Sequence, residues 1–161
     1  MKAAIIMGSD SDFPILKPAA ELLREFGIEI DVTVASAHRT PEKVRDYVLN
    51  AEKDGIGVFI VAAGAAAHLA GVVASYTTSP VIGVPINATP LNGMDALLST
   101  VQMPSGIPVA TMAVNGAKNA AIFAAEIFAV TDKGIKEKLA AYREKMKADV
   151  AKKAERVKAQ L

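Results

Sequence analysis

Short apolar runs alternate with stretches of helical periodicity along this chain, and this alternation constrains the fold more than any other feature. Residues 3–7 form the first apolar run, and apolar side chains then recur every three or four positions through 14–26. A helix after each buried strand is typical of βα units and parallel sheets. The same pattern gives expected strands at 3–7, 29–35, 58–62, 81–84 and 108–113, and expected helices at 14–26, 41–53, 66–75, 94–102, 117–128 and 132–161. The sequence therefore predicts an α/β fold with a central parallel sheet.

Glycine, threonine and proline mark several ends of these elements. Gly27 follows the first expected helix and suits a cap at its carboxyl end. Thr40 and Pro41 stand where a capping side chain and a first helical residue are favoured, so we expect Thr40 to cap the second helix. With 161 residues, no linker-like stretch and no internal repeat, the chain is expected to form a single domain, 1–161.

The last expected helix, 132–161, is amphipathic over its whole length. Its apolar residues form one stripe, made of Ile135, Leu139, Tyr142, Met146, Val150, Ala154, Val157 and Leu161. We expect this stripe to join subunits, because an exposed stripe favours aggregation; docking on its own subunit is the alternative. The segment is rich in Lys and Arg, but aromatic residues make up only 5% of the chain and no nucleic-acid-binding motif occurs. A solvated or partner-facing helix is therefore favoured over one that binds nucleic acid.

The residue types that this chain lacks exclude several function classes. It has no cysteine, which excludes disulfides, thiolate nucleophiles and cysteine metal ligands, and is compatible with a reducing compartment. No apolar run is long enough to cross a bilayer and no secretory signal is apparent, so we expect a cytoplasmic protein without a membrane partner. Two histidines without a compact carboxylate cluster make a poor metal site, and no Walker, GxGxxG or GxSxG motif occurs. We therefore expect no metal, nucleoside triphosphate or dinucleotide.

The turn after the first expected strand, 7–14, offers polar groups to a ligand. Gly8 permits a tight turn, and Ser9 and Ser11 supply hydroxyls. The following helix supplies free N–H groups and a positive dipole end, so the turn suits a phosphate. Asp12 supplies a carboxylate, which suits paired ribose hydroxyls. The alternative is that Ser11 or Asp12 caps the helix, and on this loop alone capping is favoured.

The turn at 36–41 places an imidazole beside a guanidinium at the carboxyl end of a strand, where open α/β sheets bind ligands. Arg39 can hold a phosphate through two parallel hydrogen bonds, and His38 can exchange a proton near neutral pH. A surface ion pair for Arg39 and a structural hydrogen bond for His38 are the alternatives. The adjacency of the two side chains at a strand end favours a site.

A third turn, 62–71, is built of small residues around His68. Its backbone amides can closely approach a flat ring or a carboxylate. Tight packing of helix on sheet is the alternative for the alanines, and a capping or core position is the alternative for His68. The local pattern leaves the role of His68 open.

Taken together, these loops resemble the N5-carboxyaminoimidazole ribonucleotide mutase family of bacterial purine synthesis. The matching segments are 8–12, 36–41, 66–69 with Gly71, 80–85, 98–104, 108–111 and 119–121. They cover nearly the whole chain, in order and with their spacing intact. The resemblance implies a flavodoxin-like three-layer sandwich with a long C-terminal helix. It also implies a homo-octamer in which the C-terminal helices, 132–161, help to hold subunits together.

The resemblance further implies a reaction and a site. Such enzymes convert N5-carboxyaminoimidazole ribonucleotide into 4-carboxy-5-aminoimidazole ribonucleotide by decarboxylation and recarboxylation with trapped CO2. An ATP-dependent synthetase makes the ribonucleotide substrate, and the mutase needs no cofactor. His38 would be the general acid/base. The implied substrate-binding residues are Ser9, Ser11 and Arg39 for the phosphate with Ser36 nearby, Asp12 for the ribose, and Gly64, His68 and Leu69 for the imidazole and the carboxylate.

The chain departs from the family in the third turn. Ala62, Ala65 and Ala70 replace a Gly, a Gly and a Pro. An alanine side chain can narrow the pocket, and the loss of the proline can loosen the loop. His68 indicates the bacterial mutase branch; direct carboxylation of aminoimidazole ribonucleotide with CO2 is the alternative within the family. A non-catalytic nucleotide-binding module on the same fold is the second alternative.

Overall fold

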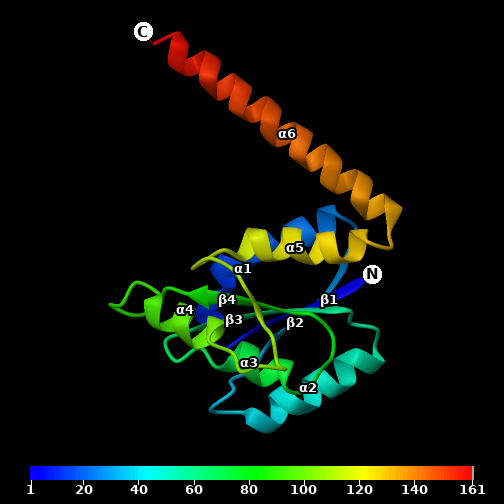
Figure 1. The fold of residues 1–161 in the computed structure, drawn as a ribbon, viewed down its shortest axis with the longest axis vertical. Helices are drawn as coiled ribbons and strands as arrows, with labels where there is room; N and C mark the ends of the chain where they lie inside the picture. The colour runs from blue at the N-terminus through cyan, green and yellow to red at the C-terminus, as the bar shows by residue number, and fades with distance from the viewer. Residues whose placement is uncertain (161) are drawn as a thin grey trace.

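A computed structural model describes residues 1–160, and within them one parallel sheet of five strands carries helices on both faces (Figure 1). The strands are β1 (Lys2–Met7), β2 (Glu29–Val34), β3 (Val58–Gly64), β4 (Val81–Ile86) and β5 (Ala110–Thr111). The helices are the short 3-10 helix η1 (Asp10–Asp12), α1 (Phe13–Glu25), α2 (Pro41–Lys53), α3 (Leu69–Ala74), α4 (Met94–Val101), α5 (Ala117–Ala129) and α6 (Lys133–Lys158). The strand order β2-β1-β3-β4-β5 is the flavodoxin-like order, so the predicted fold class is confirmed.

The three central strands are buried on both faces because their side chains are almost all apolar. After Lys2, β1 is an apolar run, as are β3 and β4, whereas all six residues of the edge strand β2 are at least partly exposed. Alternate residues along β1 enter different cores: Ile5 faces the α1–α5 side and Ile6 faces the α2–α3 side. The sheet therefore lies between two layers of helices, with α1 and α5 on one face and α2 and α3 on the other (Figure 1).

Two predicted elements are shorter in the structure. The prediction of a helix over 66–75 is wrong for its first three residues. Ala65 has a left-handed φ of 54°, and tight turns lead into a helix that starts only at Leu69. The strand expected over 108–113 shrinks to Ala110–Thr111, since Pro108 has no N–H to donate and only these two residues pair with β4.

Of the two predicted caps, one is confirmed and one is wrong. Gly27 has φ 81° and donates its N–H to the carbonyl of Arg24, as a carboxyl-terminal cap does. Thr40 precedes α2, but its hydroxyl makes no capping bond to that helix. It instead accepts from the N–H of Ser36 at 2.9 Å and donates to the Ser36 carbonyl at 3.2 Å, which closes the 36–40 turn.

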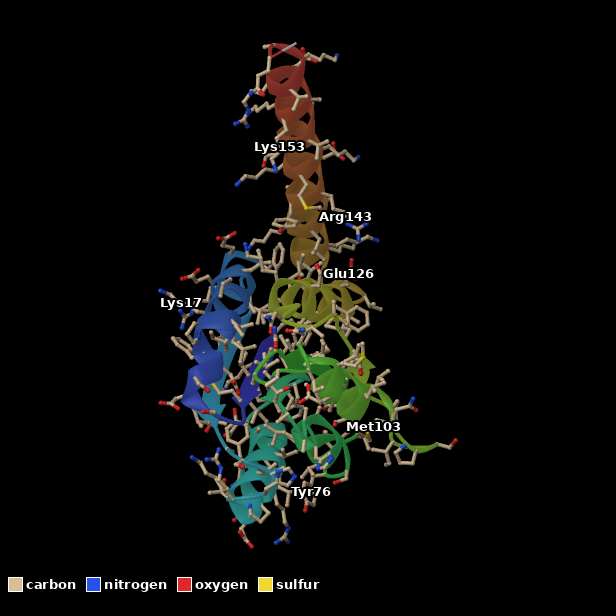
Figure 2. The ribbon with its side chains drawn as sticks, turned by 90° about the vertical axis from the view of Figure 1, so that its left-hand side faces the viewer. Lys17, Tyr76, Met103, Glu126, Arg143 and Lys153 are labelled. Atoms are coloured by element: carbon tan, nitrogen blue, oxygen red, sulfur yellow. The ribbon has the colours of Figure 1, made fainter. Side chains whose placement is uncertain are left out.

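The helix α6 leaves the body of the molecule after its first turns (Figure 1). Ile135 and Leu139 are buried, and Tyr142 packs edge-on against Phe26 with ring centroids 5.7 Å apart. Farther along, the stripe residues Met146, Val150 and Val157 are 46%, 65% and 60% exposed, and Leu161 lies outside the described residues. Figure 2 shows Arg143 beside Glu126 of α5, an ion pair of 2.6 Å, with Lys153 far beyond it. None of the helices in residues 1–160 is both long and apolar enough to cross a membrane.

Candidate active site

Three of the loops singled out in the sequence meet in one cavity. It has a volume of about 370 Å³ and lies outside the carboxyl ends of β1, β2 and β3. Its lining is Gly8, Ser9, Ser11, Asp12, Ser36, Ala37, His38, Arg39, Ala63, Gly64, Ala65, Ala66, Leu69 and Ala88. In the order β2-β1-β3, the connections from β1 and β3 lead to helices on opposite faces of the sheet. The cavity therefore sits at the switch point where such sheets bind ligands.

The β1 loop gathers two hydroxyls on the cavity wall. The N–H of Gly8 donates to the carbonyl of Ala62 at 3.0 Å, which ties this loop to β3. The Ser11 hydroxyl donates to the Ser9 hydroxyl oxygen at 2.9 Å, and the Ser11 N–H lies 3.3 Å from the same oxygen. Ser9 is thus the capping residue of η1. The alternative in which Asp12 caps the helix is wrong, because its side chain makes no capping bond at the start of α1.

Asp12 is a buried carboxyl group on this loop. Only 5% of the residue is exposed, and burial raises the pKa of its side chain above the ordinary value of 3.8. Hydrogen bonds from Ser9 and Ser11 oppose that rise in pKa, while the nearby Asp10 adds to it. At neutral pH the ionised Asp12 therefore destabilises the empty protein, and a ligand that supplies hydroxyl donors can offset this cost.

We expect Asp12→Asn to raise the free energy of unfolding at pH 7, because the amide keeps an acceptor oxygen without carrying a charge. The native-state pKa of Asp12 exceeds the unfolded value, so the penalty is complete above the native pKa and vanishes as the pH falls below 3.8. Urea unfolding of both proteins at pH 7 and pH 4 measures this. The stability gap should narrow at the lower pH; a variant less stable than the parent at pH 7 would refute the assignment.

Arg39 spans the space between the first two loops. Its Nη2 donates to the carbonyl of Gly8 at 3.2 Å, and its Nε lies 3.4 Å from the Ser36 hydroxyl, which also accepts from the Arg39 N–H at 3.2 Å. Among residues 1–160 the Arg39 guanidinium joins no ion pair, so the surface ion-pair alternative is not what the structure contains. Its positive charge faces the same cavity as the two serine hydroxyls.

His38 also lies on the cavity wall, and its ring contacts His68 of the third loop. The His38 Nε2 is 2.9 Å from the His68 Nδ1, and the rings meet edge-to-face with an interplanar angle of 87°. His68 is exposed and is not part of the lining, whereas the sequence analysis expected His68 to line the pocket itself.

The third loop approaches the cavity through its backbone. A Cβ on Gly64 would lie 2.6 Å from the Cβ of Ala88 and 3.3 Å from the carbonyl oxygen of Ile86, so only glycine fits there. Ala65 adopts its left-handed conformation on the cavity wall, and Leu69 closes the floor at the start of α3. Ala88 was missed by the sequence analysis. Only the register of the sheet reveals it, because Gly64 pairs with Ile86 and the residues just after β4 must lie beside it.

The chemistry available in this cavity is anion binding and proton transfer. Arg39 and the hydroxyls of Ser9 and Ser11 offer hydrogen-bond donors to an anion, and His38 offers an exchangeable proton. Among the described residues, no three His, Cys, Asp or Glu side chains gather as a metal site would require.

Comparisons with known proteins agree on one family. The AIR carboxylase family model matches residues 2–149. The chain is 54% identical to the N5-carboxyaminoimidazole ribonucleotide mutase of Thermotoga maritima over 97% of this chain and 91% of that protein, and 58% identical to the mutase of Methanocaldococcus jannaschii over 96% of each. It is 47% identical to the chloroplastic phosphoribosylaminoimidazole carboxylase of Vigna aconitifolia, over 94% of this chain and 27% of that protein. The crystal structure of Treponema denticola PurE superposes with a TM-score of 0.86 at 33% identity, covering 94% of both chains.

Proposed function

The chain belongs to the AIR carboxylase family, and from this premise we propose that it is an N5-carboxyaminoimidazole ribonucleotide mutase of purine biosynthesis. It converts N5-carboxyaminoimidazole ribonucleotide into 4-carboxy-5-aminoimidazole ribonucleotide. The observation that carries the proposal is the meeting of His38 and Arg39 with the serines of the β1 loop around one cavity. Arg39 and the serines suit the phosphate of a ribonucleotide, and His38 suits a proton transfer to or from the same bound molecule.

The substrate's phosphate binds at the β1 loop. Arg39, Ser9 and Ser11 donate hydrogen bonds to its oxygens, and Ser36 stays bonded to Arg39 and holds it in place. Asp12 accepts from the ribose hydroxyls, which add donors to those that Ser9 and Ser11 already supply to its buried carboxylate. Gly64 and Leu69 flank the imidazole ring and the carboxylate, while His68 contacts His38 outside the cavity lining.

His38 donates one proton and later accepts another during the reaction. It gives a proton to the exocyclic nitrogen as the nitrogen–carbon bond breaks and CO2 leaves. The ring carbon C4 then attacks the CO2, and His38 takes the proton that C4 releases, so the enzyme ends the cycle in its starting state. The cavity keeps the CO2 beside C4, which makes the second step effectively intramolecular. The reaction needs no cofactor.

Direct carboxylation of aminoimidazole ribonucleotide is the competing reaction, and a 47% identical relative is named a carboxylase. The rates of turnover of the two ribonucleotides, each supplied separately at low bicarbonate, distinguish a mutase from a carboxylase. The mutase turns over N5-carboxyaminoimidazole ribonucleotide rapidly and independently of bicarbonate. Bicarbonate-dependent turnover of aminoimidazole ribonucleotide at a comparable or higher rate would instead identify a carboxylase, and binding without turnover of either would identify a nucleotide-binding module.

The proposed assembly is a homo-octamer that includes α6, and the proposed supplier of substrate is an ATP-dependent N5-carboxyaminoimidazole ribonucleotide synthetase. The free stripe of α6 supports the assembly, since Met146, Val150 and Val157 are exposed although the helix begins by docking on its own subunit. An apolar stripe of this length on a single chain favours association.

A chain truncated before Asp132 should sediment as a smaller species than the full chain. Because Ile135 and Leu139 also cover the core, truncation alone can lower stability. The matched variant Met146→Lys with Val150→Lys keeps this core and charges only the exposed stripe. Analytical ultracentrifugation of all three proteins measures the effect, and an unchanged oligomer in both altered chains would defeat the proposed role of α6.

A further inference from the structure

The contact between His38 and His68 joins two loops that are not neighbours in the sheet. His38 follows β2 and His68 precedes α3, while β1 lies between β2 and β3. The two loops therefore meet above the carboxyl end of β1. The His38 Nε2 and His68 Nδ1 are 2.9 Å apart, which is the length of a good N–H···N hydrogen bond.

Only one proton can occupy the line between these two nitrogens. If both carried one, two N–H donors would face each other, and if neither did, two lone pairs would. With His38 Nε2 engaged in this way, Nδ1 is the ring nitrogen left to exchange a proton with a bound molecule. Among the hydrogen bonds formed within residues 1–160, the Nδ1 of His38 takes part in none.

The proposed reaction decides which ring donates in this contact. His38 must be able to release a proton and then take one back at the same place. If the His38 Nε2–H donates to His68 Nδ1, this bond persists in both states of His38: the cation carries protons on both nitrogens, and the neutral ring keeps the one on Nε2. The lone pair of neutral His38 then lies on Nδ1, where the proton must return. The opposite arrangement would have to reverse whenever His38 becomes charged.

We propose that His68 is a positioning residue for His38. Resting on the proposed function, this inference assigns His68 Nδ1 as the acceptor that holds His38 in its Nε2–H tautomer, fixes the plane of its ring and stabilises the imidazolium. The proton then passes from His38 Nδ1 to the exocyclic nitrogen, and a proton passes from C4 back to His38 Nδ1. The orienting partner of a catalytic histidine commonly sets its tautomer in this way.

This role differs measurably from substrate binding. A residue that binds the ring or the carboxylate changes KM when it is removed. A residue that keeps the catalytic base in its correct tautomer changes kcat and leaves KM nearly unaltered. The two rings pack edge-to-face with centroids 5.1 Å apart, so removing the His68 ring changes the surroundings of His38 directly. We therefore expect the effect on kcat.

Three substitutions of His68 separate these roles because their side chains reach different points. In His68→Asn the amide oxygen takes the place of Nδ1 and accepts from His38. In His68→Gln the amide reaches the place of Nε2 instead, and His68→Leu offers no acceptor. We expect kcat to fall about 10- to 100-fold in the Gln and Leu variants, with KM within about threefold, and Asn to recover most of kcat. A loss confined to KM, or equal kcat in Asn and Gln, would overturn the proposal.

A second measurement does not depend on the reaction. Ring ¹⁵N chemical shifts of His38 in the substrate-free full-length protein report its tautomer. The parent and His68→Asn should show a single Nε2–H form at a pH where His38 is neutral, and His68→Leu should show a mixture. Identical His38 spectra in the parent and His68→Leu would overturn the proposal even if the mutase activity is found. The predicted spectra without mutase activity would leave the contact supported and the proposed function refuted.

Discussion

His38→Asn should lose at least about 1000-fold in kcat while binding the ribonucleotide with an affinity within about threefold of the parent. General acid–base catalysis by one side chain contributes roughly 10²–10⁴-fold, and this imidazole is asked to act twice in each turnover. Asparagine keeps a polar group at the start of the side chain but cannot exchange a proton near neutral pH. Steady-state turnover together with calorimetric titration of the product separates the two quantities.

The binding measurement makes this prediction specific. Within residues 1–160, the His38 ring packs against no aromatic ring except that of His68, so we expect its replacement to leave the phosphate-binding groups of the β1 loop in place. The free energy of unfolding, measured beside activity, confirms that the variant folds. Normal turnover by a folded His38→Asn protein would show that another group moves the proton.

Arg39→Ala should raise KM by about 10- to 100-fold and change kcat much less. The guanidinium faces the cavity without a carboxylate partner among the described residues, so a substrate phosphate is the anion that it is free to pair with. Hydrogen bonds to charged groups contribute about 1.5–3 kcal/mol each, which corresponds to this range of affinity. Arg39→Lys should recover only part of the loss, because an ammonium cannot form the paired, planar hydrogen bonds of a guanidinium.

The matched control is Arg45→Ala. Arg45 is an exposed residue on α2 that does not line the cavity. Its replacement by Ala therefore removes the same positive charge without changing the site. Its KM should match that of the parent, and the difference between the two variants should shrink for a substrate analogue without the phosphate. Equal KM values in Arg39→Ala and the parent would rule out a phosphate contact at this residue.

The strand and helix pattern was predictable because local and tertiary preferences agree. The buried run of β1, the glycine cap after α1 and the proline at the start of α2 each appear where the sequence favours them. The prediction was wrong where tertiary contacts decide the outcome. Ala65 adopts a left-handed conformation that alanine rarely does, and only Ala110 and Thr111 of the expected fifth strand pair with β4.

The sequence predicted which loops form the candidate site, but not which side chains contact one another within it. Polar residues after parallel strands must gather at one edge of the sheet, which brings the three loops together. Ala88 carries no chemical signature, so only the register of β3 and β4 reveals it. The 2.9 Å contact of His38 with His68 depends on how two loops cross above β1, which no pattern within either loop encodes.

The most direct test of the mutase mechanism follows the carboxylate carbon. N5-carboxyaminoimidazole ribonucleotide labelled with ¹³C in its carboxylate is mixed with excess enzyme in unlabelled bicarbonate, so that a single turnover outpaces spontaneous decarboxylation. If the CO2 stays trapped in the cavity beside His38, nearly all of the 4-carboxy product should carry ¹³C. Product with the unlabelled carbon of the bulk bicarbonate would show that CO2 escapes and returns from solution, and would contradict the account.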